Sequence, residues 1–289
     1  MRRVFCILIS LLLMCGCSIN SNSRPQPEES KPPYVPPEGE LGELTVYSFK
    51  AGKADSHLIS CSDFAVLIDC GEKGFGKEIV SYLESHGIKE LDMLIITHFD
   101  KDHVGGAAKL LKEVPVKRVV QGSFIKESDE YSSYVRQLSE LGITPETPRV
   151  RLSTRLGNAE ITVYPPMQEV YKEDSSNNSS LMTSVRYGKK TLLFAADAED
   201  ARLSDFVRTE HITCDYLKVP YHGHYQTRLG MFLQAVSPQI AVITSSDEEP
   251  EDSRTMKLLS ETGAVVYLTR TAPVVAKCNG ESISAYYDE

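Results

Sequence analysis

The sequence contains no tryptophan, and basic residues are outnumbered by acidic ones. The absence of Trp excludes sugar-binding platforms built on indole rings. The 31 Lys and Arg residues stand against 40 Asp and Glu residues, which gives a formal net charge of -9. This balance argues against a basic face that holds nucleic acid non-specifically. It leaves a nuclease open, because bound metal ions can supply local positive charge.

The N-terminal apolar run is too short to span a membrane. It covers residues 4–15, whereas a spanning helix needs about 20 apolar residues. Two arginines precede it, and it ends in LMCGC at Cys17. This pattern is typical of a secretory signal and resembles the bacterial lipobox, whose Cys is lipidated. We expect residues 1–17 to be a lipoprotein signal peptide with Cys17 as lipid acceptor; a plain secretory signal is the alternative.

Residues 18–42 have the composition of a tether. They contain six of the 15 prolines and show no apolar periodicity. Proline-rich spacers favour extended polyproline II at about 3.1 Å per residue, so the segment could reach about 75 Å. A motif for a proline-reading domain is the alternative. We expect an extracytoplasmic domain, residues 43–289, that meets the membrane only through the lipid.

Few cysteines remain after Cys17, and their pairing is open. They are Cys61, Cys70, Cys214 and Cys278. An oxidising compartment permits disulfides, but four cysteines allow three pairings and the sequence does not choose among them. It does not indicate an oligomeric state either.

The globular part alternates short apolar runs with helical spacings, which is typical of an α/β protein. Two halves, each with strands followed by helices, suggest two packed sheets with helices outside. We expect strands at 44–49, 57–61, 64–69, 93–97, 118–121, 159–165, 181–187, 191–195, 216–220, 239–244, 265–269, 274–277 and 282–287. We expect helices at 77–86, 107–114, 127–141, 202–207, 227–235 and 253–261.

The most informative segment follows the apolar run at 93–97. Four possible metal ligands fall within six residues there: His98, Asp100, Asp102 and His103. Burying two Asp and two His at a strand end is costly unless they are paired or bind a metal. The two glycines that follow let the chain turn tightly into the next helix. The alternative is a solvated acidic loop.

This segment, HFDKDHVGG, resembles the metal-binding motif of metallo-β-lactamase-fold hydrolases. It is most similar to the His-x-Asp-x-Asp-His-x-Gly-Gly variant of the extracellular hydrolase domain of ComEC-type DNA-uptake proteins and their stand-alone relatives. The resemblance extends over residues 44–287. It implies a four-layer αββα sandwich, in which two mixed β-sheets pack face to face with helices outside.

Further motifs of the same group follow along the chain. They include LIDCG around Asp69, NNSSL around Asn178, LLFAADAE around Asp197, and LKVPYHGH, which holds Lys218 and His222. The resemblance implies that two divalent cations are held by His98, Asp100, Asp102, His103, Asp197 and His222. It implies supporting or substrate-orienting roles for Asp55, Asp69, Asn178 and Lys218. For Asn178 a structural turn, and for Asp69 a turn-forming role, are alternatives.

The sequence departs from the group at several positions. Lys53 and Ala54 stand in the Gly-Gln-Gly-Asp-like loop that ends at Asp55, and Ala196 replaces a Gly. Tyr221 and His224 replace a His and a Ser. His224 could protonate a leaving group, with a surface His as the alternative. His57, His86 and His211 have no motif around them.

The implied chemistry is hydrolysis by a metal-bridged hydroxide, with Asp102 orienting the nucleophile and Asp197 bridging the metals. An Asp in place of a His makes the site richer in oxygen, which favours Mn²⁺ without excluding Zn²⁺. A phosphodiesterase or DNA nuclease is the expected function, with Lys101, Lys218 and Arg228 as local cations. The alternatives are hydrolysis of a cell-wall phosphodiester or a lactone-type ester, and a non-catalytic surface domain that binds DNA or a partner.

Overall fold

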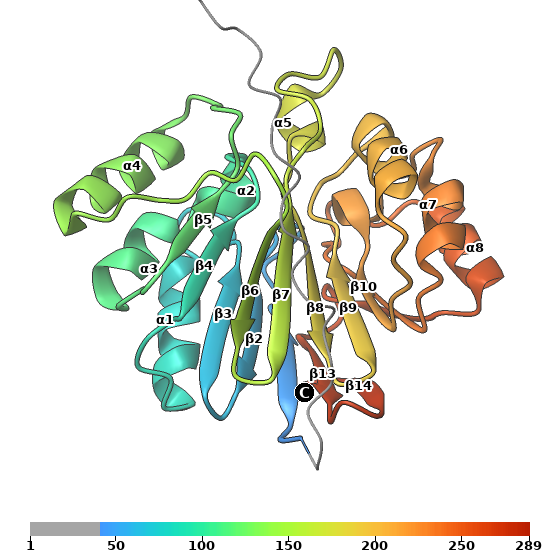
Figure 1. Cartoon of the computed structure of the whole chain (residues 1–289), viewed down its shortest axis with the longest axis horizontal. Helices are drawn as coiled ribbons and strands as arrows, with labels where there is room; N and C mark the ends of the chain where they lie inside the picture. Colours follow the sequence, from blue (N-terminus) through green and yellow to red (C-terminus); the bar gives the residue numbers. More distant parts are fainter. Residues whose placement is uncertain (1–40) are drawn as a thin grey trace, which may run out of the picture. The chain divides into compact units, whose positions relative to one another are not determined.

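The computed structural model describes residues 41–289 (Figure 1). The expected signal peptide, Cys17 and the tether up to residue 40 lie outside the described residues. Of the expected tether, Leu41 packs against the main hydrophobic core. The carbonyl of Gly42 accepts a hydrogen bond from the Tyr187 hydroxyl at 2.9 Å. These two residues therefore already belong to the folded domain.

The first half of the domain and the C-terminal hairpin form one seven-stranded mixed sheet. Its order is β14-β13-β1-β2-β3-β4-β5. Strands β3, β4 and β5 run parallel, and the other pairs are antiparallel. The strands are β1 (Leu44–Ser48), β2 (His57–Cys61), β3 (Phe64–Ile68), β4 (Met93–Ile96), β5 (Val119–Gln121), β13 (Val274–Cys278) and β14 (Ile283–Tyr287).

The second half forms another seven-stranded mixed sheet, in the order β12-β11-β10-β9-β8-β7-β6. Strands β9 to β12 are parallel, and β6 to β9 are antiparallel. The strands are β6 (Leu152–Leu156), β7 (Ala159–Tyr164), β8 (Met182–Tyr187), β9 (Lys190–Phe194), β10 (Tyr216–Lys218), β11 (Ile240–Ile243) and β12 (Val265–Leu268).

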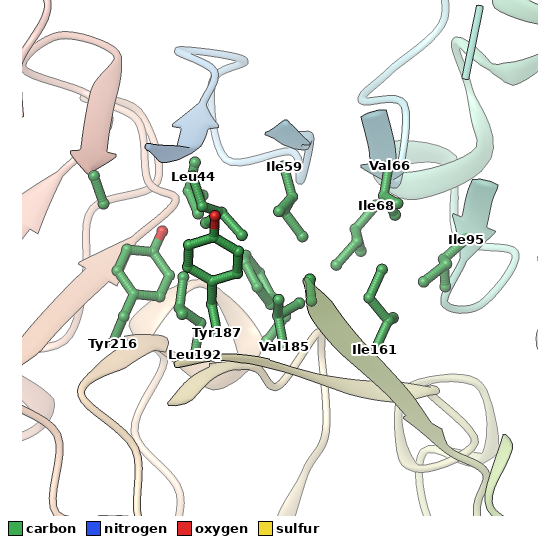
Figure 2. Close-up of a cluster of buried hydrophobic side chains, with 14 of the residues drawn as sticks. Leu44, Ile59, Val66, Ile68, Ile95, Ile161, Val185, Tyr187, Leu192 and Tyr216 are labelled. Atoms are coloured by element: carbon green, nitrogen blue, oxygen red, sulfur yellow. The ribbon is translucent and has the colours of Figure 1, made fainter. Parts of the chain in front are cut away.

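The two sheets pack face to face through a continuous apolar core. Figure 2 shows Ile59, Val66 and Ile95 of the first sheet opposite Ile161, Val185 and Leu192 of the second. Side chains alternate between the faces of a strand, so every second residue of these strands enters this core. The intervening residues face the helices.

Helices cover the two outer faces, which completes the expected αββα sandwich (Figure 1). Leu67, Leu94 and Ile96 pack toward helices of the first half, and Leu193, Leu217 and Ala241 toward helices of the second. The first set is α1 (Gly76–Ser85), α3 (Ala107–Glu113) and α4 (Asp129–Leu141); the second is α6 (Asp200–Thr209), α7 (Leu229–Val236) and α8 (Ser253–Thr262). The expected fold class is confirmed.

Four short elements were not expected: β6, α2 (Lys101–Val104), α5 (Ser175–Asn178) and the 3₁₀ turn η1 (Pro220–Gly223). The three helical ones are four residues long, too short to show a helical repeat. The cysteines Cys61, Cys70, Cys214 and Cys278 are free thiols. No helix among residues 41–289 is long and apolar enough to cross a membrane.

Candidate metal centre

The expected metal ligands come from strand ends of both sheets. His98 and Asp100 follow β4, and Asp102 and His103 lie on α2. Asp197 follows β9, and His222 lies on η1 directly after β10. Because β4, β9 and β10 belong to parallel parts of their sheets, their carboxyl ends deliver these side chains to one edge of the sandwich,.

Asp197 is at the centre of the cluster. Its Oδ2 lies 3.2 Å from His103 Nε2 and 2.9 Å from His222 Nε2. His222 Nε2 is also 3.6 Å from Asp102 Oδ2. One ligand atom from each of Asp102, His103, Asp197 and His222 falls within 4.8 Å of the others. The spacing suits a shared divalent cation.

The other two expected ligands are next to this cluster. The imidazole rings of His98 and His103 are 4.1 Å apart between centroids. Asp100 Oδ1 lies 3.9 Å from His98 Nε2. The Asp100 carboxylate also accepts hydrogen bonds from Lys126 and Ser176. His98 and Asp100 thus form a second pair of donors, with Asp197 within the electrostatic reach of His98.

Four buried ligand atoms have no hydrogen-bond partner: Nε2 of His98, His103 and His222, and Oδ1 of Asp197. Buried polar atoms of folded proteins are nearly always hydrogen-bonded, and each orphan costs about 1–3 kcal/mol. Nitrogen and carboxylate oxygen are donors that divalent metals accept. The residues present therefore fit a metal centre.

The opposite ring nitrogens are all engaged, and this fixes the tautomers. His103 Nδ1 lies 2.8 Å from Asp69 Oδ2, which can only accept. The Thr97 hydroxyl donates to Asp69 at 2.7 Å, so it accepts from His98 Nδ1 at 3.0 Å. The Thr244 hydroxyl donates to Asp55 at 2.6 Å, so it accepts from His222 Nδ1 at 3.1 Å. In the neutral, metal-binding form of each ring, Nδ1 therefore carries the proton and Nε2 directs a lone pair into the site.

Asp69 and Asp55 thus support the ligands from behind. Asp69 is fully buried and also accepts from the Thr97 amide at 2.8 Å. Asp55 is buried beside Lys218, whose Nζ contacts its carboxylate and donates to the Ala196 carbonyl at 2.9 Å. Burial opposes ionisation of Asp55, but Lys218 and the nearby imidazoles hold its pKa well below the usual range.

Lys218 corrects one expectation. It was expected among the cations available to a nucleic acid, but its side chain is fully buried under Asp55. Asn178 is buried as well, and its amide bonds to the backbone: Oδ1 accepts from Arg202 N at 2.9 Å, and Nδ2 donates to the Glu173 carbonyl at 3.0 Å. These contacts join α5 to α6.

His224 and Tyr221 stand on the η1 side of the centre. Their rings are 5.0 Å apart, and both side chains are partly buried. Burial lowers the pKa of His224, and the neighbouring His222 and Lys53 lower it further. Glu199, two residues after Asp197, is also partly buried, and burial raises its pKa to about 7.

Backbone strain is concentrated at the centre. Among residues 41–289, six non-glycine residues have positive φ, and four of them are Asp69, Ala196, Tyr221 and His222. L-residues pay about 1–2 kcal/mol in this region. Such strain persists where the surroundings over-determine it, which is common at functional sites.

The electrostatics of the cluster also suit a cation. Burial opposes the charge of Asp197, but His222 and His103 hold its pKa well below the usual range. Burial works against protonation of His103, yet Asp197 and Asp69 raise its pKa well above the usual value. The carboxylates that draw a proton onto the imidazole would draw a divalent cation in the same way.

Sequence reasoning missed several residues of the site. Thr97, Thr244 and Ser180 hydrogen-bond ligand imidazoles. His57, which has no motif, is buried 3.9 Å from Asp55. Thr97 could have been found, because it directly precedes His98; Thr244 has no such signal.

Comparison with known proteins agrees with this geometry. Residues 50–245 match the family model of the metallo-beta-lactamase superfamily. The chain is 30% identical over 171 residues to ComE operon protein 3 of Bacillus subtilis, covering 58% of this chain and 22% of that protein. It is 27% identical over 213 residues to Recombination protein 2 of Haemophilus influenzae, covering 71% and 24%. The chain thus spans about a quarter of the length of these relatives.

A solved structure shows the same fold. The metallo-beta-lactamase fold protein YhfI from Bacillus subtilis superposes with a TM-score of 0.54 at 14% identity, covering 85% of this chain and all of that one. The family match covers the loops that carry all six expected ligands. This chain belongs to the metallo-β-lactamase superfamily.

Proposed function

We propose that this chain is an extracytoplasmic, metal-dependent phosphodiesterase that is anchored through a lipid on Cys17, with single-stranded DNA as the favoured substrate. The observation that carries the proposal is a set of three buried imidazoles with unpartnered Nε2 atoms: those of His103 and His222 lie 3.2 and 2.9 Å from Asp197, and the His98 ring lies 4.1 Å from that of His103. The name of one relative, Recombination protein 2, refers to recombination and supports a DNA substrate. The N-terminal motif supports the anchor.

The donor set favours phosphodiesters and a hard cation. Asp100, Asp102 and Asp197 contribute carboxylates beside three imidazoles. Carboxylate-rich sites suit Mn²⁺ better than thiolate or all-imidazole sites do, and Zn²⁺ also accepts these donors. Two such cations, when bound, supply a water of lowered pKa and positive charge for a developing oxyanion.

We assign each residue around the centre a separate role in the hydrolysis. Asp102, at 3.6 Å from His222 Nε2, would orient the attacking water, and Asp197 would hold both halves of the centre together. His224 is two residues beyond His222; because its pKa is lowered, it would be neutral at pH 7 and would donate a hydrogen bond to the leaving oxygen. The orienting groups Asp69, Thr97, Thr244 and Asp55 keep the imidazoles in place.

The test is hydrolysis of bis-p-nitrophenyl phosphate by the full-length chain in detergent, metal-stripped and after addition of Mn²⁺ or Zn²⁺. We expect metal-dependent turnover that the double substitution Asp102→Ala, His103→Ala reduces by at least about 100-fold. The matched control is His211→Ala, an exposed histidine after α6. No turnover with metal demonstrably bound would contradict the proposal and would favour a lactone-type ester or a binding role.

A further inference from the structure

Two lysines contact the aspartates of the metal centre, and neither has a role in the chemistry described so far. Lys53, in the loop between β1 and β2, places Nζ 3.5 Å from Asp102 Oδ2 and 3.2 Å from Glu249 Oε2. Lys126, in the loop between β5 and α4, places Nζ 2.5 Å from Asp100 Oδ2. Each lysine therefore stands beside one expected ligand.

The lysines approach from opposite sides. Asp100 and Asp102 follow β4, which has β5 as its neighbour on one side and β3, β2 and β1 on the other. Lys126 belongs to the loop after β5, and Lys53 to the loop between β1 and β2. Neighbouring strands are about 4.8 Å apart, so the two loops start about 15 Å from each other across the ligands.

Both lysines are open to a ligand from solution. The exposed fractions of the Lys53 and Lys126 side chains are 30% and 48%. By contrast, the Lys218 side chain under the centre is fully buried. When Asp100 and Asp102 bind a cation, the Lys126 ammonium can contact another anion, and so can that of Lys53, whose remaining partner Glu249 is exposed. Lysine commonly binds phosphate in this way, as a point charge.

We propose that Lys53 and Lys126 bind the two phosphates that flank the scissile phosphodiester. The inference rests on the proposed function and narrows its substrate to a polyanionic chain with phosphates on both sides of the bond that is cut. It also explains how a chain with a net charge of -9 can bind such a polymer. The cations need to be placed only at the cut site, on either side of the metals.

The first test compares thymidine oligonucleotides of two lengths with the full-length, metal-loaded chain. The dinucleotide has only the scissile phosphate, whereas the tetranucleotide cut at its centre has one phosphate on each side. We expect wild type to cleave the tetranucleotide with a higher kcat/KM than the dinucleotide. In Lys53→Met and in Lys126→Met, the ratio of these two kcat/KM values should fall about tenfold. Lys53→Arg and Lys126→Arg should keep most of it, because the charge remains.

The matched control is Lys117→Met. Lys117 likewise contacts carboxylates, those of Glu90 and Asp92, but it lies before β5, at the end of the sheet opposite the site. Its substitution should leave the length preference unchanged. If Lys53→Met and Lys126→Met keep the full preference of wild type, the proposal is wrong and the phosphodiesterase activity stands.

The second test measures binding instead of turnover. Fluorescence anisotropy with a labelled twelve-residue oligothymidylate would be recorded between 50 and 200 mM salt, with the metal bound and with it stripped. Each lysine that contacts a phosphate adds about 0.7 to the slope of log K against log salt for a single strand. We expect the slope to decrease by this amount in Lys53→Met and in Lys126→Met. It should be unchanged in Lys117→Met. Equal slopes in all variants would overturn the proposal; a reduced slope without any hydrolysis would support the contacts and refute only the enzymatic function.

Discussion

Three histidines of the centre are oriented by hydrogen bonds from Nδ1 to oxygen atoms on the side away from the centre. His103 uses a carboxylate directly, whereas His98 and His222 each use a threonine hydroxyl that in turn donates to a buried aspartate. Each threonine hydroxyl donates its only proton to a carboxylate. It can therefore only accept a hydrogen bond from the histidine, as a carboxylate would. Partners of this kind set the tautomer and basicity of a ligand imidazole.

Replacement of Thr244 by Val should weaken metal binding. The Thr244→Val change keeps the shape of the side chain but removes the acceptor of the His222 Nδ1 proton. Loss of such a partner typically costs 10–100-fold in metal affinity, and we expect a decrease of at least about tenfold. Competition with a chromophoric chelator measures it.

Thr255→Val is the control for this experiment. Thr255 is also fully buried, on α8, but its hydroxyl has no hydrogen-bond partner. This substitution should leave metal affinity unchanged. If both variants bind metal as wild type does, Thr244 does not set the state of His222.

At the residue scale, the sequence predicts the candidate ligands and the aspartates Asp55 and Asp69 behind them, but not the threonines or the two solvent-accessible lysines that contact them. His98, Asp100, Asp102 and His103 are close in the chain, so their spacing alone indicates a metal site. Lys126 is 26 positions from Asp100, and Thr244 is 22 from His222. These contacts exist only because strands adjacent in a sheet bring distant loops together.

At the element scale, α6 holds the second half of the site in place through one buried cation. Arg202 donates from Nη2 to the Tyr164 carbonyl at 2.7 Å and from Nε to the Ser180 carbonyl at 3.2 Å. Its backbone amide is bound by Asn178. The helix is thereby attached to β7 and to the segment before β8. The hydroxyl of Ser180, in turn, is 3.3 Å from His98 Nδ1.

Replacement of Arg202 by Met should therefore destabilise the domain. Met fills much of the volume but leaves two buried carbonyl oxygens without donors, which we expect to lower the free energy of unfolding by about 3 kcal/mol. Urea denaturation measures it. Arg208→Met, on the same helix, removes an exposed arginine paired with Asp205 and should change stability by no more than about 0.5 kcal/mol. Equal effects of the two substitutions would refute a special role for Arg202.

The elements themselves were largely predictable from the sequence, and the exceptions have physical reasons. Runs such as Met93–Ile96 are apolar throughout because both faces of the strand are covered,. Strand β6 was missed because it is an edge strand whose residues are only partly buried. Helix α5 has the sequence SSNN, which is typical of a turn and shows no apolar face.

On the scale of the whole molecule, the metal centre joins the two sheets. His98 to His103 come from the first sheet, and Asp197 and His222 from the second. In the absence of a cation, the cluster combines buried carboxylates with buried nitrogen atoms that lack partners. A cation would therefore stabilise contacts between the halves and remove a polar cost from the interior.

Metal should consequently raise the thermal stability of the entire domain, not of one loop. A ligand at 100 times its Kd stabilises the native state by about 2.7 kcal/mol, provided that it does not bind the unfolded chain. For a domain of this size, that corresponds to a rise in Tm of about 5–10 °C. Calorimetry of the metal-stripped chain titrated with Mn²⁺ or Zn²⁺ measures the rise.

Asp197→Asn separates this coupling from a local effect. The substitution removes the carboxylate charge between His103 and His222 but keeps the size of the side chain. We expect the metal-dependent rise in Tm to shrink to less than half, while His211→Ala retains it in full. A single transition that moves as a whole would show that both sheets unfold together. If Asp197→Asn kept the full rise, the Asp197 carboxylate would not hold the cation, and of the two ligands from the second sheet only His222, 3.6 Å from Asp102, would connect that sheet to the centre.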